Sequence, residues 1–75
     1  MEERILNVLR IVFNDAAIDA SCSQKTCKAW DSMNHLNLVV ELEMEFSVTF
    51  EPEEIGRMVS YYDIKELINY KKENA

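Results

Sequence analysis

The stretch that decides the fold runs from Trp30 to Phe46 and reads WDSMNHLNLVVELEMEF. Its second and third residues, Asp31 and Ser32, favour the N-cap of a helix, because their side-chain oxygens accept from backbone N–H groups that the first turn leaves unpaired. Apolar residues then recur with helical spacing as far as Phe46. We expect this helix to turn one apolar face into a core, formed by Leu36, Val39, Leu42 and Phe46.

The flanking sequence predicts three more helices. An amphipathic pattern over residues 3–13 indicates a first helix. Pro52 suits the first position of a short helix over residues 52–58. A capping-box pattern over residues 60–63 opens a last helix. The inward face of that last helix is expected to carry Ile64, Leu67 and Ile68.

Residues 14–30 form the longest segment without helical periodicity. A stretch of this kind in a small chain is expected to be functional or to wrap the core. The length of 75 residues allows a single domain, so we treat residues 1–75 as one unit. The sequence therefore predicts an all-α fold, a small four-helix bundle with three longer helices, one short helix and a long first loop.

The chain is acidic, with 8 basic and 14 acidic residues and a formal net charge of −6, and 48% of its residues are apolar. That apolar fraction excludes an intrinsically disordered chain. The charge favours partners with basic surfaces, and we expect neither nucleic acid nor a membrane as a partner. No apolar run reaches the roughly 18 residues needed to cross a bilayer, and the N-terminus lacks a signal-peptide pattern. We expect a cytoplasmic monomer.

The motif Asp31-Ser32-Met33 resembles the attachment motif of the acyl carrier protein family, which reads Asp-Ser-Leu at the start of the second helix. In that family the serine carries 4′-phosphopantetheine, whose terminal thiol holds an acyl group as a thioester. The resemblance implies the same covalent cofactor on Ser32. It also implies that Asp31 assists the modification, since the matching family aspartate helps to bind the metal in the transferase site.

The resemblance extends over nearly the whole chain. Residues 38–46 are similar to the second helix of the family, which ends in Glu-Phe, and residues 52–55 and 63–69 resemble its third and fourth helices. It implies a single phosphopantetheine-attachment domain over residues 1–75. Where many members have Gly-Ala or Gly-Gly before the motif, this chain has Ala29-Trp30. The form Trp-Asp-Ser-Met-Asn-His looks more like discrete carriers that work outside the main fatty-acid pathway.

The resemblance implies a carrier rather than an enzyme. Its partners would be a phosphopantetheinyl transferase and a ligase, synthase or acyltransferase that loads the cargo and presents a basic surface. Two alternatives remain open: an aminoacyl carrier of the D-alanyl type, which also uses Asp-Ser-Met, and a helical interaction module in which Ser32 is only an N-cap. Family members shelter acyl chains between their helices, so a long acyl cargo is expected to raise thermal stability.

A second stripe of residues lies on the side of the 32–46 helix away from the expected core, at i, i+4, i+7 and i+11: Met33, Asn37, Val40 and Met44. Flexible methionine side chains suit surfaces that fit several partners. Glu41 and Glu43 lie on either edge of the stripe. We expect these six residues to contact partner enzymes, the alternative being that Met33 and Met44 are additional core residues.

Other constellations are weaker. Asp31, Ser32 and His35 could be taken for a hydrolytic triad, but the chain is too small for an enclosed pocket and lacks a Gly-rich turn for an oxyanion hole. We therefore expect no catalytic residue and place His35 on the helix surface or at the edge of the core. Cys22 and Cys27 lack two further zinc ligands and are expected to be reduced, unpaired thiols without an assigned role. No metal site is expected.

Overall fold

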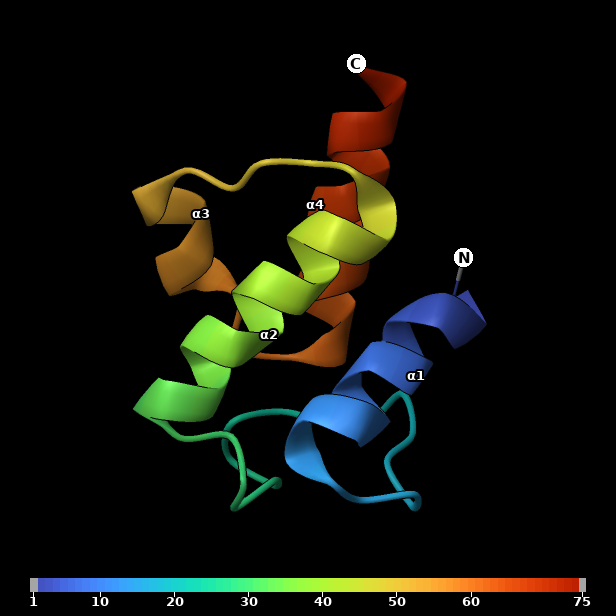
Figure 1. The fold of residues 1–75 in the computed structure, drawn as a ribbon, viewed down its shortest axis with the longest axis vertical. Helices are drawn as coiled ribbons and strands as arrows, with labels where there is room; N and C mark the ends of the chain where they lie inside the picture. Colours follow the sequence, from blue (N-terminus) through green and yellow to red (C-terminus); the bar gives the residue numbers. More distant parts are fainter. Residues whose placement is uncertain (1, 75) are drawn as a thin grey trace.

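The computed structural model describes residues 2–74 and contains four helices, α1 (Glu2–Phe13), α2 (Ser32–Phe46), α3 (Pro52–Arg57) and α4 (Tyr61–Glu73). The predicted all-α fold, with three longer helices, one short helix and a long first loop, is confirmed. α1 packs against α2 and α4, and α3 lies on the opposite side of α2 (Figure 1). No helix in the described chain combines the length and apolar character needed to cross a bilayer.

The most deeply buried part of the core is built from apolar side chains of α1, α2 and α4, with one residue that directly follows α3. Eight of these side chains are almost completely excluded from solvent: Ile5, Leu9, Leu38, Leu42, Phe46, Met58, Ile64 and Ile68. On the last helix, the predicted inward residues Ile64 and Ile68 are buried, and Leu67 is half-buried against them. The periodicity of the sequence therefore places the first and last helices correctly.

The inward face of α2 differs from the prediction at one position. Leu36 is 61% exposed, whereas Leu38 is fully buried. The remaining predicted residues, Val39, Leu42 and Phe46, are buried. Leu38, Leu42 and Phe46 are spaced by four, and Leu36 lies roughly a third of a turn away from Leu42. The prediction of Leu36 as a core residue is wrong, because this angle puts Leu36 on the flank of the helix and not on its inward face.

The long first loop wraps the core, which is one of the two roles expected for it. Ile18, Cys22 and Trp30 are buried within it. Its backbone pairs with the start of α4, where the Tyr61 N–H donates to the Cys22 carbonyl at 2.9 Å. The Gln24 N–H donates to the Val59 carbonyl, also at 2.9 Å. The loop therefore delivers the chain to α2 along a defined path, despite its lack of regular structure.

α3 packs differently from the other helices, because none of its six residues is buried. Met58, expected to be its last residue, follows it as the C-cap and is fully buried. The Lys71 ammonium of α4 pairs with the Glu54 carboxylate at 2.7 Å, and both side chains are less than 20% exposed. α3 is therefore held by this ion pair with α4, by the half-buried Ile55 that packs against the core, and by Met58 directly after its end.

Candidate functional site

α2 begins at the end of the bundle opposite to the C-terminus (Figure 1). Ser32 is its first residue and is exposed. The N-cap is its neighbour Asp31, whose backbone is extended and whose carboxylate Oδ1 accepts from the Asn34 N–H at 2.8 Å. Within residues 2–74 the Ser32 hydroxyl makes no hydrogen bond. The interpretation of Ser32 as the helix cap is therefore wrong, because Asp31 fills that position and leaves the Ser32 oxygen available for chemistry.

The backbone around Ser32 suits a negatively charged group. The N–H groups of Ser32 and Met33 find no acceptor in the described part of the chain, as expected for the first turn of a helix. The first turn of α2 contains no acidic side chain. Unpaired N–H groups and the positive end of the helix dipole together attract a phosphate at this position. A phosphate ester on the Ser32 oxygen would lie close to both.

The rings of Trp30 and His35, which lie close to Ser32, form a hydrogen-bonded pair. The Trp30 indole N–H donates to His35 Nδ1 at 2.9 Å, and the two rings stack with centroids 6.2 Å apart. Because Nδ1 accepts, Nε2 carries the proton and donates to the Ile55 carbonyl of α3 at 2.7 Å. Both nitrogens of the His35 ring are occupied, so His35 cannot act as a base for Ser32. His35 is half-buried at the edge of the core, which is one of the two positions predicted for it.

A surface hollow of about 530 Å³ begins at Ser32, and we call it the Ser32 hollow. Three of its lining residues precede α2 and three belong to α2: Gln24, Trp30, Asp31, Ser32, His35 and Leu36. Leu36 is an exposed apolar side chain, whereas the Gln24 amide is polar. The hollow therefore offers a mixed surface next to the serine. The sequence did not identify Gln24, Trp30 or Leu36 as lining residues, because their proximity depends on the path of the loop.

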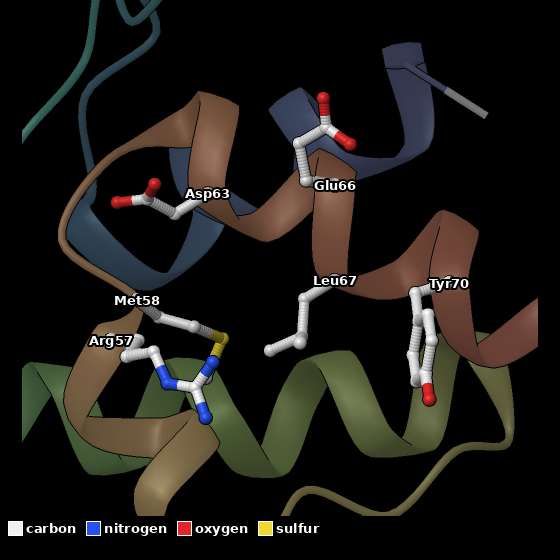
Figure 2. Close-up of a pocket in the computed structure, with 6 residues that line it drawn as sticks. All are labelled: Arg57, Met58, Asp63, Glu66, Leu67 and Tyr70. Atoms are coloured by element: carbon white, nitrogen blue, oxygen red, sulfur yellow. The ribbon is translucent and has the colours of Figure 1, made fainter.

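A second, smaller hollow of about 210 Å³ lies between α3 and α4 (Figure 2). Met58 and Leu67 point into it, whereas the carboxylates of Asp63 and Glu66 turn away from these two side chains (Figure 2). None of the site residues expected from the sequence lines this hollow. The larger hollow beside Ser32 is therefore the one that belongs to the candidate site.

The outer side of α2 carries an exposed apolar surface, which we call the outer face of α2. It contains Met33 at 74% exposure, Leu36 at 61%, Val40 at 52% and Met44 at 71%. The alternative that Met33 and Met44 are additional core residues is therefore wrong. Asn37 is exposed among these side chains, in the position that the stripe predicted. Leu36 joins this surface, although the sequence pattern predicts it in the core.

The two glutamates beside this face differ in their surroundings. The Glu43 carboxylate is half-buried and accepts from the Phe50 N–H at 2.9 Å, so it anchors the loop that follows α2. Glu41 is exposed, and its carboxylate has no ion-pair or hydrogen-bond partner within residues 2–74. Glu45, one turn further on, pairs with Arg4 of α1 at 2.9 Å. Of these three acids, Glu41 is the one whose charge is free to meet a partner.

The two cysteines lie in the long loop, do not line the Ser32 hollow, and form no disulfide. Burial, together with the neighbouring Cys27, raises the pKa of the Cys22 thiol to about 12. Cys22 is therefore a neutral thiol at physiological pH and a poor nucleophile. Across residues 2–74, no cluster of three or more His, Cys, Asp or Glu side chains is arranged to hold a metal ion.

Comparisons with known proteins give a similarity among the solved structures. No protein-family model matches the chain, and a search of curated proteins gives no match. Among solved structures, the chain is similar to the solution NMR structure of the holo acyl carrier protein from Geobacter metallireducens, with a TM-score of 0.86 and 28% sequence identity. The similarity covers 97% of this chain and 86% of that protein.

Proposed function

The chain belongs to the acyl carrier protein family, and we propose that it carries acyl groups as thioesters on a 4′-phosphopantetheine arm attached to Ser32. The observation that carries this proposal is the position of the Ser32 hydroxyl, which is exposed and makes no hydrogen bond in the described chain. Asp31 provides the cap that a serine at a helix start would ordinarily provide. Ser32 therefore has no structural duty that modification would disturb.

The residues around Ser32 fit a phosphodiester. On modification the Ser32 oxygen would give its proton to a base of the transferase and form a bond to the phosphorus of coenzyme A that bears the pantetheine, while the pyrophosphate P–O bond breaks and adenosine 3′,5′-bisphosphate leaves. The product carries a negative charge next to the unpaired N–H groups of Ser32 and Met33. The arm supplies the thiol that carries cargo, and the Ser32 hollow lies next to its point of attachment.

Asp31 has two roles in this proposal. One carboxylate oxygen, Oδ1, is engaged by the Asn34 N–H and so fixes the orientation of the side chain. The residue is exposed, so its second oxygen can contact the transferase during modification. The family resemblance assigns to this aspartate a contribution to the metal site of the transferase. The cap thus holds Asp31 in an orientation that the modifying enzyme can use.

Partner enzymes would dock on the outer face of α2, next to Ser32. Its four apolar side chains offer area that a partner can bury at roughly 25 cal/mol per Å², and the methionines can adapt to more than one enzyme. Asn37 provides a polar contact within this face, and Glu41 provides a free charge at its edge. Glu43 contributes indirectly, because its carboxylate holds the loop after α2. A phosphopantetheinyl transferase and a loading ligase, synthase or acyltransferase with basic groups beside an apolar patch would fit this surface.

Intact-mass spectrometry after incubation with a broad-specificity phosphopantetheinyl transferase tests the proposal. The wild-type chain is expected to gain the mass of one phosphopantetheinyl group, and Ser32→Ala is expected to gain nothing. Ser21→Ala is the matched control, since Ser21 is another exposed serine, in the long loop, and this variant is expected to be modified fully. An unmodified wild-type chain would leave a helical interaction module as the better account, and a modified Ser32→Ala chain would show that the arm is attached elsewhere.

A further inference from the structure

Trp30 and His35 stand between the Ser32 hollow and the hydrophobic core, and we propose that they act as a plug that keeps the cargo of this carrier at the surface. This inference rests on the proposed attachment of the arm to Ser32. It assigns Trp30 and His35 as specificity-determining residues. The cargo class is a short or polar acyl or aminoacyl group that remains in the Ser32 hollow, rather than a long alkyl chain buried between the helices.

The spacing of residues on α2 places His35 at the outer end of the buried row. His35, Leu38 and Leu42 follow one another at i, i+3 and i+7, so they share one side of the helix. Leu38 and Leu42 are fully buried, whereas His35 is half-buried and lines the hollow. An acyl chain that entered the core along α2 from Ser32 would meet the His35 ring first.

Hydrogen bonds hold the plug to α3 on one side and to the loop before α2 on the other. His35 Nε2 donates to the Ile55 carbonyl at 2.7 Å, which joins α2 to α3. His35 Nδ1 accepts from the Trp30 indole at 2.9 Å, which joins α2 to the loop before it. Trp30 is 5% exposed and contacts Phe13 of α1, with ring centroids 5.2 Å apart. Moving either ring would therefore leave buried polar groups without partners, which is unfavourable.

The residues behind the plug belong to the buried core. Leu38, Leu42 and Met58 are fully buried, and close-packed interiors accept additional atoms only with rearrangement. A short acyl group has few methylenes to bury and so gains little from entering. The Ser32 hollow offers it the exposed Leu36 side chain and the Gln24 amide instead. This arrangement departs from the sheltering of long chains that the family resemblance implied.

The test compares cargo length in the wild-type chain and in variants of the plug. A phosphopantetheinyl transferase supplied with acetyl-, butyryl- or decanoyl-coenzyme A would place each acyl arm on Ser32, as checked by intact mass. Two readouts follow: the rate at which hydroxylamine cleaves the thioester, and the melting temperature by circular dichroism. His35→Ala removes both hydrogen bonds, and Trp30→Phe removes only the indole N–H. Lys28→Ala, an exposed loop substitution, is the matched control.

In the wild type and in Lys28→Ala, the decanoyl and acetyl thioesters are expected to be cleaved at the same rate, and neither acyl group is expected to raise the melting temperature. In His35→Ala the decanoyl thioester is expected to be cleaved roughly tenfold more slowly, as a chain that is buried about nine-tenths of the time would be. His35→Gln, whose amide can still donate to the Ile55 carbonyl, is expected to restore most of the wild-type rate. Trp30→Phe keeps an aromatic ring in place but removes the hydrogen bond to His35, so it is also expected to slow cleavage of the decanoyl thioester. It provides the test if His35→Ala does not fold.

Two results would overturn this inference. One is a wild-type chain that already protects the decanoyl thioester and melts at a higher temperature when it carries decanoate. The other is a set of folded plug variants in which the decanoyl thioester is no better protected than the acetyl thioester. Both leave the proposed function standing, since the arm is attached in each. A chain that accepts no acyl-phosphopantetheinyl group from any donor would instead overturn the proposed function, and this inference with it.

Discussion

The cap formed by Asp31 provides a substitution series that separates its structural role from its role in modification. Asp31→Ala removes the acceptor of the Asn34 N–H and the carboxylate charge together. Asp31→Asn keeps a good N-cap, because an asparagine oxygen can accept the same hydrogen bond, but it removes the charge. We therefore expect Asp31→Ala to lose both stability and modification, and Asp31→Asn to lose modification alone.

The size of the stability effect follows from the structure. The hydrogen bond from the Asn34 N–H to Asp31 Oδ1 is short, 2.8 Å, and it is the side-chain cap of a 15-residue helix. Loss of such a cap costs about 1 kcal/mol, which in a domain of this size corresponds to a decrease of about 4–8 °C in melting temperature. Circular dichroism melts measure this decrease, and a mass-spectrometric time course with the transferase measures the rate of modification.

Ser60→Ala is the matched control, because Ser60 caps α4 by accepting from the Asp63 N–H at 3.1 Å. It is expected to lose a similar amount of stability, about 1 kcal/mol, and to be modified at the wild-type rate below its melting temperature. The reasoning is refuted if Asp31→Asn melts as low as Asp31→Ala, since the cap would then depend on the charge. It is equally refuted if Asp31→Asn is modified as fast as the wild type, since Asp31 would then be only a cap.

Three further substitutions test the docking surface and the attachment of α3. Met44→Glu puts a charge into the outer face of α2 and is expected to weaken binding of the cognate partner about tenfold, roughly the loss of one buried apolar side chain, as isothermal titration calorimetry would show. Glu41→Lys is expected to weaken the same binding only at low salt, because exposed charges are screened; a loss that persists at high salt would contradict this. The Glu51 N–H, and then Lys71, hold the pKa of Glu54 below its ordinary value of 4.5. The stabilising effect of Glu54 is therefore complete above that value and lost as the pH falls through the lowered pKa, so Glu54→Gln should flatten the decrease in melting temperature on acidification.

Much of the fold follows from local patterns in the sequence. The 3.6-residue periodicity marks the buried faces of the first and last helices, and Pro52 marks the start of α3. The sequence also places Asp31 and Ser32 at the start of α2, where the structure has them. These features depend on neighbours along the chain, so a single sequence is enough to predict them.

Features that depend on distant parts of the chain could not be predicted in the same way. Leu36 is as apolar as Leu38, and its exposure follows from which side of α2 the rest of the fold covers. The hydrogen bonds of His35 require both the path of the long loop and the position of α3. One signal was present in the sequence: Trp30 and His35 flank the first turn of α2, and both carry ring N–H groups that need partners when they are buried.

The central claim is that the Ser32 oxygen carries the arm, and site-localising mass spectrometry of the modified chain tests it most directly. No Lys or Arg lies between Lys28 and Arg57, so tryptic cleavage releases a peptide of residues 29–57 that contains Ser32 and Ser47. Fragmentation of this peptide is predicted to place the whole phosphopantetheinyl mass on Ser32 and none on Ser47. The mass found on Ser47, on another residue or nowhere in the chain would contradict the account.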